Sequence, residues 1–323
     1  MDRIICIMGP TATGKSKLAV ALAKKLNGEV ISCDSMQIYR GMDIGTAKVT
    51  PEEMQGVVHH MIDVAEPWED YSVSRFCEAA KPIVDRLLAE NKTVLLAGGT
   101  GQYMDALISG HSFAPYPSTG KREALEGFAE ENGIEALWNR LKEVDPASAQ
   151  RLPLGDKRRI IRALEIYEET GQTMTEHDRL TRLRPKDYHP FYLALTYENR
   201  ADLYEKIDLR VDEMVKRGLE QEVSQLLDRG VPETATGMQA IGYKEFLALR
   251  RGEATRQQTL EKIKQGSRNY AKRQLTWLKR NKEISYISLP AHPEFPEVFA
   301  QAMEILRAKG FFDYFPQTPT LTK

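Results

Sequence analysis

Short apolar runs and helical patterns alternate over the first hundred residues. The apolar runs are IICIM, EVISC and TVLLA, and the segments between them include SKLAVALAKKL and the stretch from about Ser72 to Glu90. These segments carry apolar residues at helical spacing, and their alternation with short apolar runs is typical of βαβ units. This part of the chain therefore predicts an α/β fold with a P-loop-like core, in which a parallel sheet is flanked by helices.

The pattern changes between about residues 112 and 190. Prolines at positions 115, 117, 146 and 153 punctuate helical patterns there, and no convincing strand occurs. We therefore expect a small all-helical insertion domain over residues 113–189.

Strand and helix patterns resume after the insertion. FYLALTY and ISYISL are strand-like, and an amphipathic helix is expected from about Asn199 to Arg217. Residues 1–112 and 190–312 are therefore assigned to one core with a basic, helical C-terminal part. Residues 313–323 are expected to form a flexible tail.

Composition favours a soluble, cytoplasmic protein. Hydrophobic residues make up 41% and charged residues 28% of the chain, as in ordinary globular domains, and no stretch approaches the length of a membrane span. The first apolar run leads directly into a glycine motif, so it indicates a strand and not a signal peptide. The three cysteines form no CxxC pair, which fits a reducing compartment and argues against a structural zinc site. We also expect the protein to be a monomer.

Basic residues gather near the C-terminal end, although the formal net charge of the whole chain is -1. Residues 250–282 contain eleven lysines and arginines and two acidic residues, a net charge of +9. Most of them lie on a long helix expected over residues 253–281. This segment is a candidate face for nucleic-acid phosphates, and an ordinary solvated helix face is the alternative.

A phosphate-binding motif follows the first predicted strand. Residues 9–16 read GPTATGKS, match G-x-x-x-x-G-K-[ST], and lie between a predicted strand and a predicted helix. Gly9 and Gly14 permit the positive φ angles that direct backbone N–H groups inward, and the following helix adds its positive dipole end. Lys15 would place its charge on terminal phosphate oxygens, and Ser16 would ligate a bridging Mg²⁺. The expected diphosphate-binding residues are Gly9, Pro10, Thr11, Ala12, Thr13, Gly14, Lys15 and Ser16.

The acidic metal ligand that P-loop enzymes use for ATP chemistry is hard to find in this chain. The strand TVLLA ends in GGTG, from Gly98 to Gly101, with no carboxylate, which argues against a kinase. The strand EVISC does end in an acid, Asp34, at the sheet edge where open α/β folds place ligands. Asp34 is therefore the candidate catalytic group, and a turn cap beside Ser35 is the alternative.

Asp34 also opens a long motif that has companions along the chain. The run from Asp34 to Lys48 reads DSMQIYRGMDIGTAK, and it stands in order with GPTATGKS, AGGTGQY, DKRRIIRALE, GMQAIGYKE and YAKRQLTW. Together these motifs extend from about residue 4 to about residue 290. In this order they resemble the motifs of bacterial tRNA dimethylallyltransferases.

The resemblance implies that the P-loop holds dimethylallyl diphosphate in place of ATP. The dimethylallyl group would go to the exocyclic amine of the adenosine 3′-adjacent to the anticodon, in tRNAs that read codons beginning with U. Lys15, Arg210 and Mg²⁺ on Ser16 would stabilise the leaving diphosphate. Asp34 would accept the proton of the amine. The implied catalytic residues are Lys15, Asp34 and Thr100.

The resemblance also implies contacts with an anticodon stem-loop whose target base leaves the stack. For Thr100 a helix cap is the alternative, and for the arginines of residues 158–162 it is helix-face pairing with Glu165 and Glu169. Either Lys121 or Arg122 matches a contact at the entry to the insertion. The implied RNA-binding residues are Asp34, Ser35, Met36, Gln37, Thr100, Arg122, Arg158, Arg159, Ile160, Ile161, Arg162, Gly237, Gln239, Gly242, Tyr243, Lys272, Arg273 and Gln274.

Other interpretations of the same features stay open. An adenylate dimethylallyltransferase acting on free nucleotide would share the P-loop and the Asp34 motif, but not the RNA-like motifs near the C-terminal end. A P-loop small-molecule kinase would turn over ATP, and a regulatory RNA-binding module would turn over no diphosphate.

Some aromatic residues and histidines suggest binding only superficially. The aromatic residues at helical spacing more often belong to a core than to a base-stacking surface. They are Tyr39, Tyr103, Trp138 and Trp277. His59 and His60 are adjacent, and on a helix they would point about 100° apart, which argues against a metal pair.

Overall fold

The structure, a computed structural model, describes residues 1–110, 119–183 and 185–315. The chain divides into two compact units, one formed by Met1–Gly110 with Asp187–Lys323 and the other by His111–Lys186. We call them the main unit and the helical unit and describe each by itself. Among the described residues, no helix combines the length and the apolar character needed to cross a membrane.

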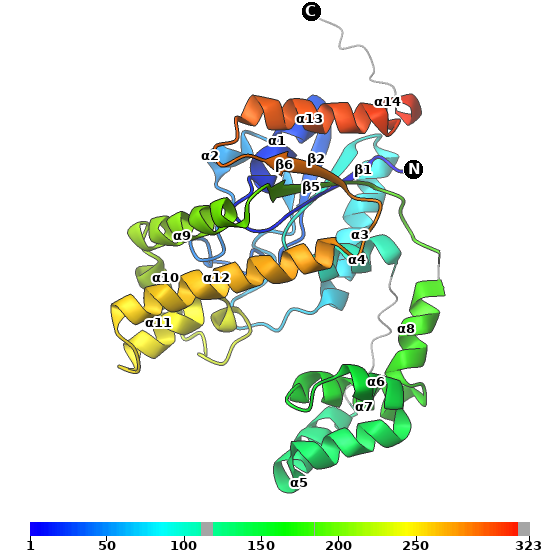
Figure 1. The fold of residues 1–323 in the computed structure, drawn as a ribbon, viewed down its shortest axis with the longest axis vertical. Coiled ribbons are helices and arrows are strands. Elements are labelled where there is room, and N and C mark those ends of the chain that lie inside the picture. The colour runs from blue at the N-terminus through cyan, green and yellow to red at the C-terminus, as the bar shows by residue number, and fades with distance from the viewer. Residues whose placement is uncertain (111–118, 184, 316–323) are drawn as a thin grey trace, which may run out of the picture. The chain divides into compact units, whose positions relative to one another are not determined.

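The main unit is built on a six-stranded parallel sheet with the strand order β3-β2-β4-β1-β5-β6 (Figure 1). The strands are β1 Ile4–Met8, β2 Gly28–Ser32, β3 His59–His60, β4 Thr93–Ala97, β5 Phe191–Tyr197 and β6 Ser285–Leu289. This sheet confirms the predicted α/β class. One local expectation was wrong, because His59 and His60 form a strand and not part of a helix.

Helices cover both faces of the sheet, which is why its central strands are apolar throughout. Alternate residues of a strand point to opposite faces. Accordingly Ile4 and Cys6 enter one core with α3 (Val73–Ala89) and α4 (Gly101–Ser109). Ile5 and Ile7 enter a second core with α1 (Lys15–Lys25) and α13 (Phe295–Ala308).

The remaining helices of the main unit lie mostly in its C-terminal part. They are α2 Pro51–Met54, α9 Arg200–Lys216, α10 Leu219–Asp228, η1 Gly237–Gln239, α11 Tyr243–Arg250, α12 Arg256–Leu278 and α14 Phe311–Tyr314. Helices α9 and α12 lie side by side (Figure 1). The expected flexible tail was wrong at its start, since residues 313 and 314 belong to α14, and residues 316–323 lie outside the described part.

The helical unit contains α5 Lys121–Val144, α6 Pro146–Arg151, α7 Lys157–Thr170 and α8 Met174–Leu183. Asp145 fixes the start of α6, because its carboxylate accepts hydrogen bonds from Ser148 N at 3.0 Å and from Thr175 N at 3.0 Å. Burial opposes the charged form of Asp145, but the hydrogen bonds from Thr175 and Ser148 hold its pKa below the ordinary value.

Candidate active site

Three loops meet at the carboxyl edge of the sheet because the strands before them are neighbours. The order β2-β4-β1 places the loop after β2, which contains Asp34, next to the loop after β4, which contains Thr100, and next to the P-loop after β1. Ligands of open α/β sheets bind outside this edge. Residues that are far apart in the sequence are therefore brought together by the strand order.

The P-loop requires glycine at both ends of its turn. Gly9 has φ +141°, and a Cβ there would lie 2.5 Å from the carbonyl oxygen of Leu195 in β5. Gly14 has φ +81° and precedes the first residue of α1. Inside the loop, Thr13 Oγ1 and Lys15 Nζ both donate to the carbonyl oxygen of Pro10, at 2.9 and 2.7 Å. The loop is thus ordered by contacts of its own residues.

Two cations lie beside this loop in partly buried positions. Burial, aided by the nearby Arg210 guanidinium and opposed by Asp34, lowers the pKa of Lys15 to about 7. Burial also lowers the pKa of Arg210, and its Nε has no hydrogen-bond partner among the described residues. Because an anion between the two cations would raise both pKa values, this pair fits a ligand that carries several negative charges.

Ser16 presents a hydroxyl at the start of the helix that follows the P-loop. It is exposed in the first turn of α1, and its hydroxyl makes no hydrogen bond within the described part of the chain. Among the described residues, no group of three or more His, Cys, Asp or Glu side chains could hold a metal. The Ser16 hydroxyl could be one ligand of a Mg²⁺ ion, which takes few protein ligands and keeps waters and phosphate oxygens.

Asp34 forms a turn and still presents a carboxylate oxygen. Its Oδ1 accepts a hydrogen bond from Met36 N at 2.9 Å, so the turn-cap interpretation is correct as far as this oxygen goes. No hydrogen bond reaches Oδ2 from any described residue, and the side chain is partly exposed. The carboxylate acts electrostatically on both Lys15 and Arg210.

Thr100 joins the loop after β4 to the loop after β2. Its Oγ1 accepts from Ser35 N at 3.0 Å and donates to Ser35 Oγ at 3.3 Å. Although Thr100 stands at the N-terminal end of α4, its side chain makes no capping hydrogen bond. The helix-cap alternative for this side chain was therefore wrong, because its hydroxyl is engaged by Ser35 beside Asp34.

The glycines of the GGTG segment allow close approach on two sides. A Cβ on Gly98 would lie 2.1 Å from the carbonyl oxygen of Cys33. A Cβ on Gly99 would lie 2.3 Å from Gln274 Nε2, and one on Gly101 would lie 2.3 Å from the Trp277 ring. Contacts under 3 Å leave no room for a side chain, so this segment packs tightly against both the Asp34 loop and α12.

Several residues expected to contact RNA are buried in this structure. Ile160 and Ile161 are 0% and 2% exposed in the core of the helical unit. Tyr243 is 0% and Gln274 is 7% exposed. Gly237 and Gly242 are also buried. In the P-loop, the N–H of Thr11 donates to Gln274 Oε1 at 3.0 Å and is not free for a phosphate.

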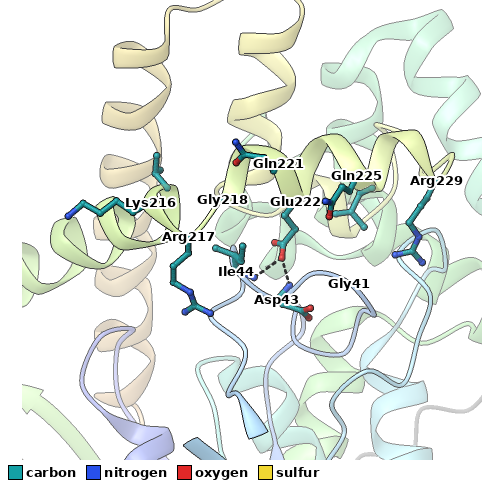
Figure 2. Close-up of a pocket in the computed structure, with 12 residues that line it drawn as sticks. Gly41, Asp43, Ile44, Lys216, Arg217, Gly218, Gln221, Glu222, Gln225 and Arg229 are labelled. Carbon is teal, nitrogen blue, oxygen red and sulfur yellow. Dashed lines mark hydrogen bonds between the residues drawn. The ribbon is translucent and has the colours of Figure 1, made fainter. Parts of the chain in front are cut away.

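Glu222 of α10 orders the middle of the long motif and was not anticipated from the sequence. Its carboxylate is 7% exposed and accepts from the backbone N–H groups of Asp43, Ile44 and Gly45, at 2.9, 2.7 and 3.1 Å (Figure 2). It also accepts from Tyr243 Oη at 2.6 Å. Glu222, Asp43 and Ile44 also line a cavity of about 610 Å³ between this loop and α10.

Lys48, the last residue of the long motif, stabilises the same loop. Its side chain is buried, and its ammonium group donates to the carbonyl oxygen of Tyr39 at 2.8 Å. It also pairs with Asp43 at 2.5 Å and with Asp63 at 2.6 Å. Much of the motif therefore builds the loop that follows Asp34. Gln37, another residue of the motif, is held by a hydrogen bond in which its Oε1 accepts from Ser32 Oγ at 3.0 Å.

The basic block of residues 250–282 divides into two parts. On the N-terminal half of α12, Lys264 pairs with Asp212 at 2.7 Å and Arg268 pairs with Asp208 at 2.6 Å, both acids lying on α9. Five basic residues that have no acidic partner in the described part lie further along, and they are Lys272, Arg273, Lys279, Arg280 and Lys282. Arg250 and Lys262, nearer the start of the block, also have none there. Residues 272–282 therefore hold most of the unpaired charge and are the better candidate face for phosphates.

In the helical unit, acidic partners account for part of the arginine cluster. Arg162 pairs with Glu165 at 2.8 Å, as the helix-face alternative expected. Arg159 pairs with Asp156 at 3.5 Å. Arg158 is exposed and has no ion pair within the described residues.

The entry position of the helical unit is also engaged by acids. Arg122 contacts Glu165 and Glu126, each at 3.4 Å, and Lys121 contacts Glu169 at 3.9 Å. These surface pairs contribute little stability and leave the cations accessible.

The aromatic residues bear out the core interpretation. Tyr39 and Tyr103 are buried in the main unit, and Trp138 packs on the core of the helical unit while its Nε1 donates to the carbonyl oxygen of Leu152 at 3.2 Å. Trp277 lies against Gly101.

The fold and the site define a P-loop protein that sets a carboxylate beside its phosphate-binding loop. A family model described as IPP transferase matches residues 37–281. The chain belongs to this family, and the resemblance inferred from its motifs is confirmed.

Similar proteins support the same assignment over nearly the whole chain. The tRNA dimethylallyltransferase of Caldanaerobacter subterraneus subsp. tengcongensis is 45% identical over 309 residues, covering 95% of this chain and 98% of that protein. The tRNA dimethylallyltransferase of Geobacillus thermodenitrificans is 45% identical over 304 residues, covering 94% of each.

Solved structures agree with these sequences. The tRNA isopentenylpyrophosphate transferase from Bacillus halodurans matches with a TM-score of 0.72 and 39% identity, over 96% of this chain and 97% of that one. A eukaryotic dimethylallyltransferase acting on tRNA matches with a TM-score of 0.82 and 28% identity, over 99% of this chain and 82% of that one.

Replacing the buried acid, Glu222→Gln, tests whether it holds the long motif in place. An amide NH₂ cannot accept hydrogen bonds, so we expect a loss of about 2 kcal/mol in the free energy of unfolding. Backbone amides of residues 43–45 should also exchange faster. The control is Glu220→Gln on the same helix, where the carboxylate is 40% exposed and the change should stay within about 0.5 kcal/mol. Equal stability of the two variants would contradict the assignment.

Proposed function

We propose that this protein transfers the dimethylallyl group of dimethylallyl diphosphate to the exocyclic amine of the adenosine 3′-adjacent to the anticodon. The acceptors are tRNAs that read codons beginning with U, and the products are N6-dimethylallyladenosine and diphosphate. The observation that best supports this proposal is the position of Asp34, because the strand order β2-β4-β1 brings its loop to the same sheet edge as the P-loop with Lys15. A proton acceptor and an anion-binding loop therefore lie together in one site.

The P-loop side of the site serves the leaving group. As the bond between the allylic carbon and the diphosphate oxygen breaks, negative charge grows on the diphosphate. Backbone N–H groups of residues 12–16, the dipole of α1 and the cations of Lys15 and Arg210 oppose that charge. Mg²⁺, held by the Ser16 hydroxyl and diphosphate oxygens, would supply further neutralisation of the leaving group.

The Asp34 side of the site serves the nucleophile. The adenine amine is weakly nucleophilic because its lone pair is delocalised into the ring. As the new carbon–nitrogen bond forms, the amine loses a proton, and the free Oδ2 of Asp34 accepts it. The turn held by Met36 N keeps the carboxylate in place. Thr100 supports the same loop through Ser35.

The unpaired basic face of α12 serves the RNA. Lys272 and Arg273 are exposed, and each lies over an aromatic ring, Tyr204 at 5.9 Å and Tyr270 at 5.5 Å. Contacts of exposed lysines and arginines with phosphates fix the position of an RNA without reading its sequence. The adenosine must leave its stack to reach Asp34, as in other enzymes that modify a base.

The test of the function runs three reactions in parallel. Labelled dimethylallyl diphosphate and Mg²⁺ are supplied with an unmodified anticodon stem-loop or with AMP, and labelled ATP is supplied in a third reaction. We expect label in the stem-loop alone. Label in AMP would assign the protein to free-nucleotide prenylation, and phosphoryl transfer from ATP without prenylation would make it a kinase.

Asp34→Asn tests the proton acceptor. Asparagine can keep the hydrogen bond from Met36 N through its own Oδ1, but it cannot take up the proton of the amine. We expect turnover to fall about tenfold or more while affinity for dimethylallyl diphosphate stays the same. The matched control is Asp228→Asn, on an exposed acid at the end of α10 that has no ion pair in the described part of the chain. Unchanged turnover in Asp34→Asn would remove Asp34 as the base.

A double variant, Lys272→Gln with Arg273→Gln, tests the RNA face. The KM for the stem-loop should rise, and the dependence of log affinity on log salt should become shallower by about 0.7 to 0.9 for each lost phosphate contact. Lys264→Gln is the control, because Lys264 is already paired with Asp212. If Lys264→Gln weakened the salt dependence as much as the double variant does, the assignment of the phosphate contacts to Lys272 and Arg273 would be contradicted.

A further inference from the structure

One face of α12 rests on the GGTG segment. Tyr270, Gln274 and Trp277 are spaced as i, i+4 and i+7, so they share a face of the helix. The carbonyl oxygen of Gly99 accepts from Gln274 Nε2 at 2.9 Å and from Tyr270 Oη at 3.3 Å. The Trp277 ring lies where a side chain on Gly101 would be. This face therefore sets the position of the segment that contains Thr100.

Gln274 reaches a second loop as well. Its Oε1 accepts a hydrogen bond from the N–H of Thr11 in the P-loop at 3.0 Å. A primary amide carries an acceptor and donors on one planar group, so a single side chain can join an N–H of one loop to a carbonyl of another. The side chain is 7% exposed, and such a buried bridge has no water to replace it.

Further contacts link Gln274 to the proposed base, Asp34. Gly99 precedes Thr100, the Thr100 hydroxyl accepts from Ser35 N, and Ser35 follows Asp34. We propose that Gln274 is a positioning residue that holds the diphosphate loop and the proton-accepting loop in register with each other. This inference rests on the proposed function and adds to it how the two halves of the reaction are aligned.

The fold does not need this bridge to hold α12 in place. The helix is fixed to α9 by the pairs Lys264–Asp212 and Arg268–Asp208, and it buries Ala271 and Leu278. Loss of the Gln274 amide should therefore disturb alignment more than it disturbs folding.

The first test is Gln274→Met, which keeps the length of the side chain and removes both hydrogen bonds. Because a small misplacement of reacting groups is costly, we expect kcat to fall about tenfold or more. The KM values for dimethylallyl diphosphate and for the stem-loop should change by less than about threefold, since each substrate still meets its own loop. Gln265→Met is the control, because Gln265 is an exposed residue of the same helix, and its kinetics should match those of the unchanged protein.

A second variant, Gln274→Glu, separates alignment from packing. At alkaline pH its carboxylate can accept from Thr11 N but repels the carbonyl oxygen of Gly99. When the carboxyl takes up a proton, its O–H can donate to that carbonyl and restore the bridge. The kcat of this variant relative to the unchanged protein should therefore rise as the pH is lowered. A ratio that does not depend on pH would indicate a packing role and overturn the proposal.

A measurement without RNA keeps this inference separate from the proposed function. In Gln274→Met the backbone amide of Thr11 should exchange with solvent about tenfold faster or more, because it loses its acceptor. If the unchanged protein prenylates no RNA, the proposed function fails, and the exchange of Thr11 alone decides whether the bridge exists. Unchanged exchange, unchanged kcat, or a rise in the KM for RNA alone would each overturn the proposal.

Discussion

The adjacency of β2, β4 and β1 is the constraint on which the rest of the site depends. Parallel strands place their carboxyl ends at one edge, so the Asp34 loop, the GGTG segment and the P-loop meet although they are far apart in the sequence. Glycines at this edge allow the backbones to approach closely, because a Cβ on Gly9 or Gly98 would clash with Leu195 or Cys33. This edge explains how one site can hold a leaving diphosphate and a proton acceptor together.

The C-terminal helices support this edge from outside the sheet. Glu222 of α10 binds three successive backbone N–H groups of the long motif, and Gln274 of α12 joins two loops. Two of the six basic residues of α12 are paired with acids of α9, and the other four are exposed. Under the proposed function, one face of this helix would support the loops of the reaction centre and another face would contact RNA.

Local signals in the sequence were sufficient to predict the sheet, the P-loop and Asp34. Each of these depends on residues close together in the chain, such as an apolar run that ends in a glycine motif or an acid. The contacts of Gln274 with Thr11 and of Glu222 with Asp43 join residues 263 and 179 positions apart, and no local pattern marks them. Ile160 and Ile161 lie in the core of the helical unit, because a motif shared by a family contains core residues as well as contact residues.

The central claim is that the carboxyl edge of the sheet receives both substrates, with the diphosphate on the P-loop and the adenine at Asp34. The most direct measurement is a crystal structure with the stem-loop and the unreactive sulfur analogue of dimethylallyl diphosphate, in which sulfur replaces the bridging oxygen. The account predicts the diphosphate on the backbone N–H groups of residues 12–16 and the exocyclic amine within hydrogen-bond distance of Asp34 Oδ2. An adenine amine bound away from Asp34, or a diphosphate bound away from Lys15 and Arg210, would contradict it.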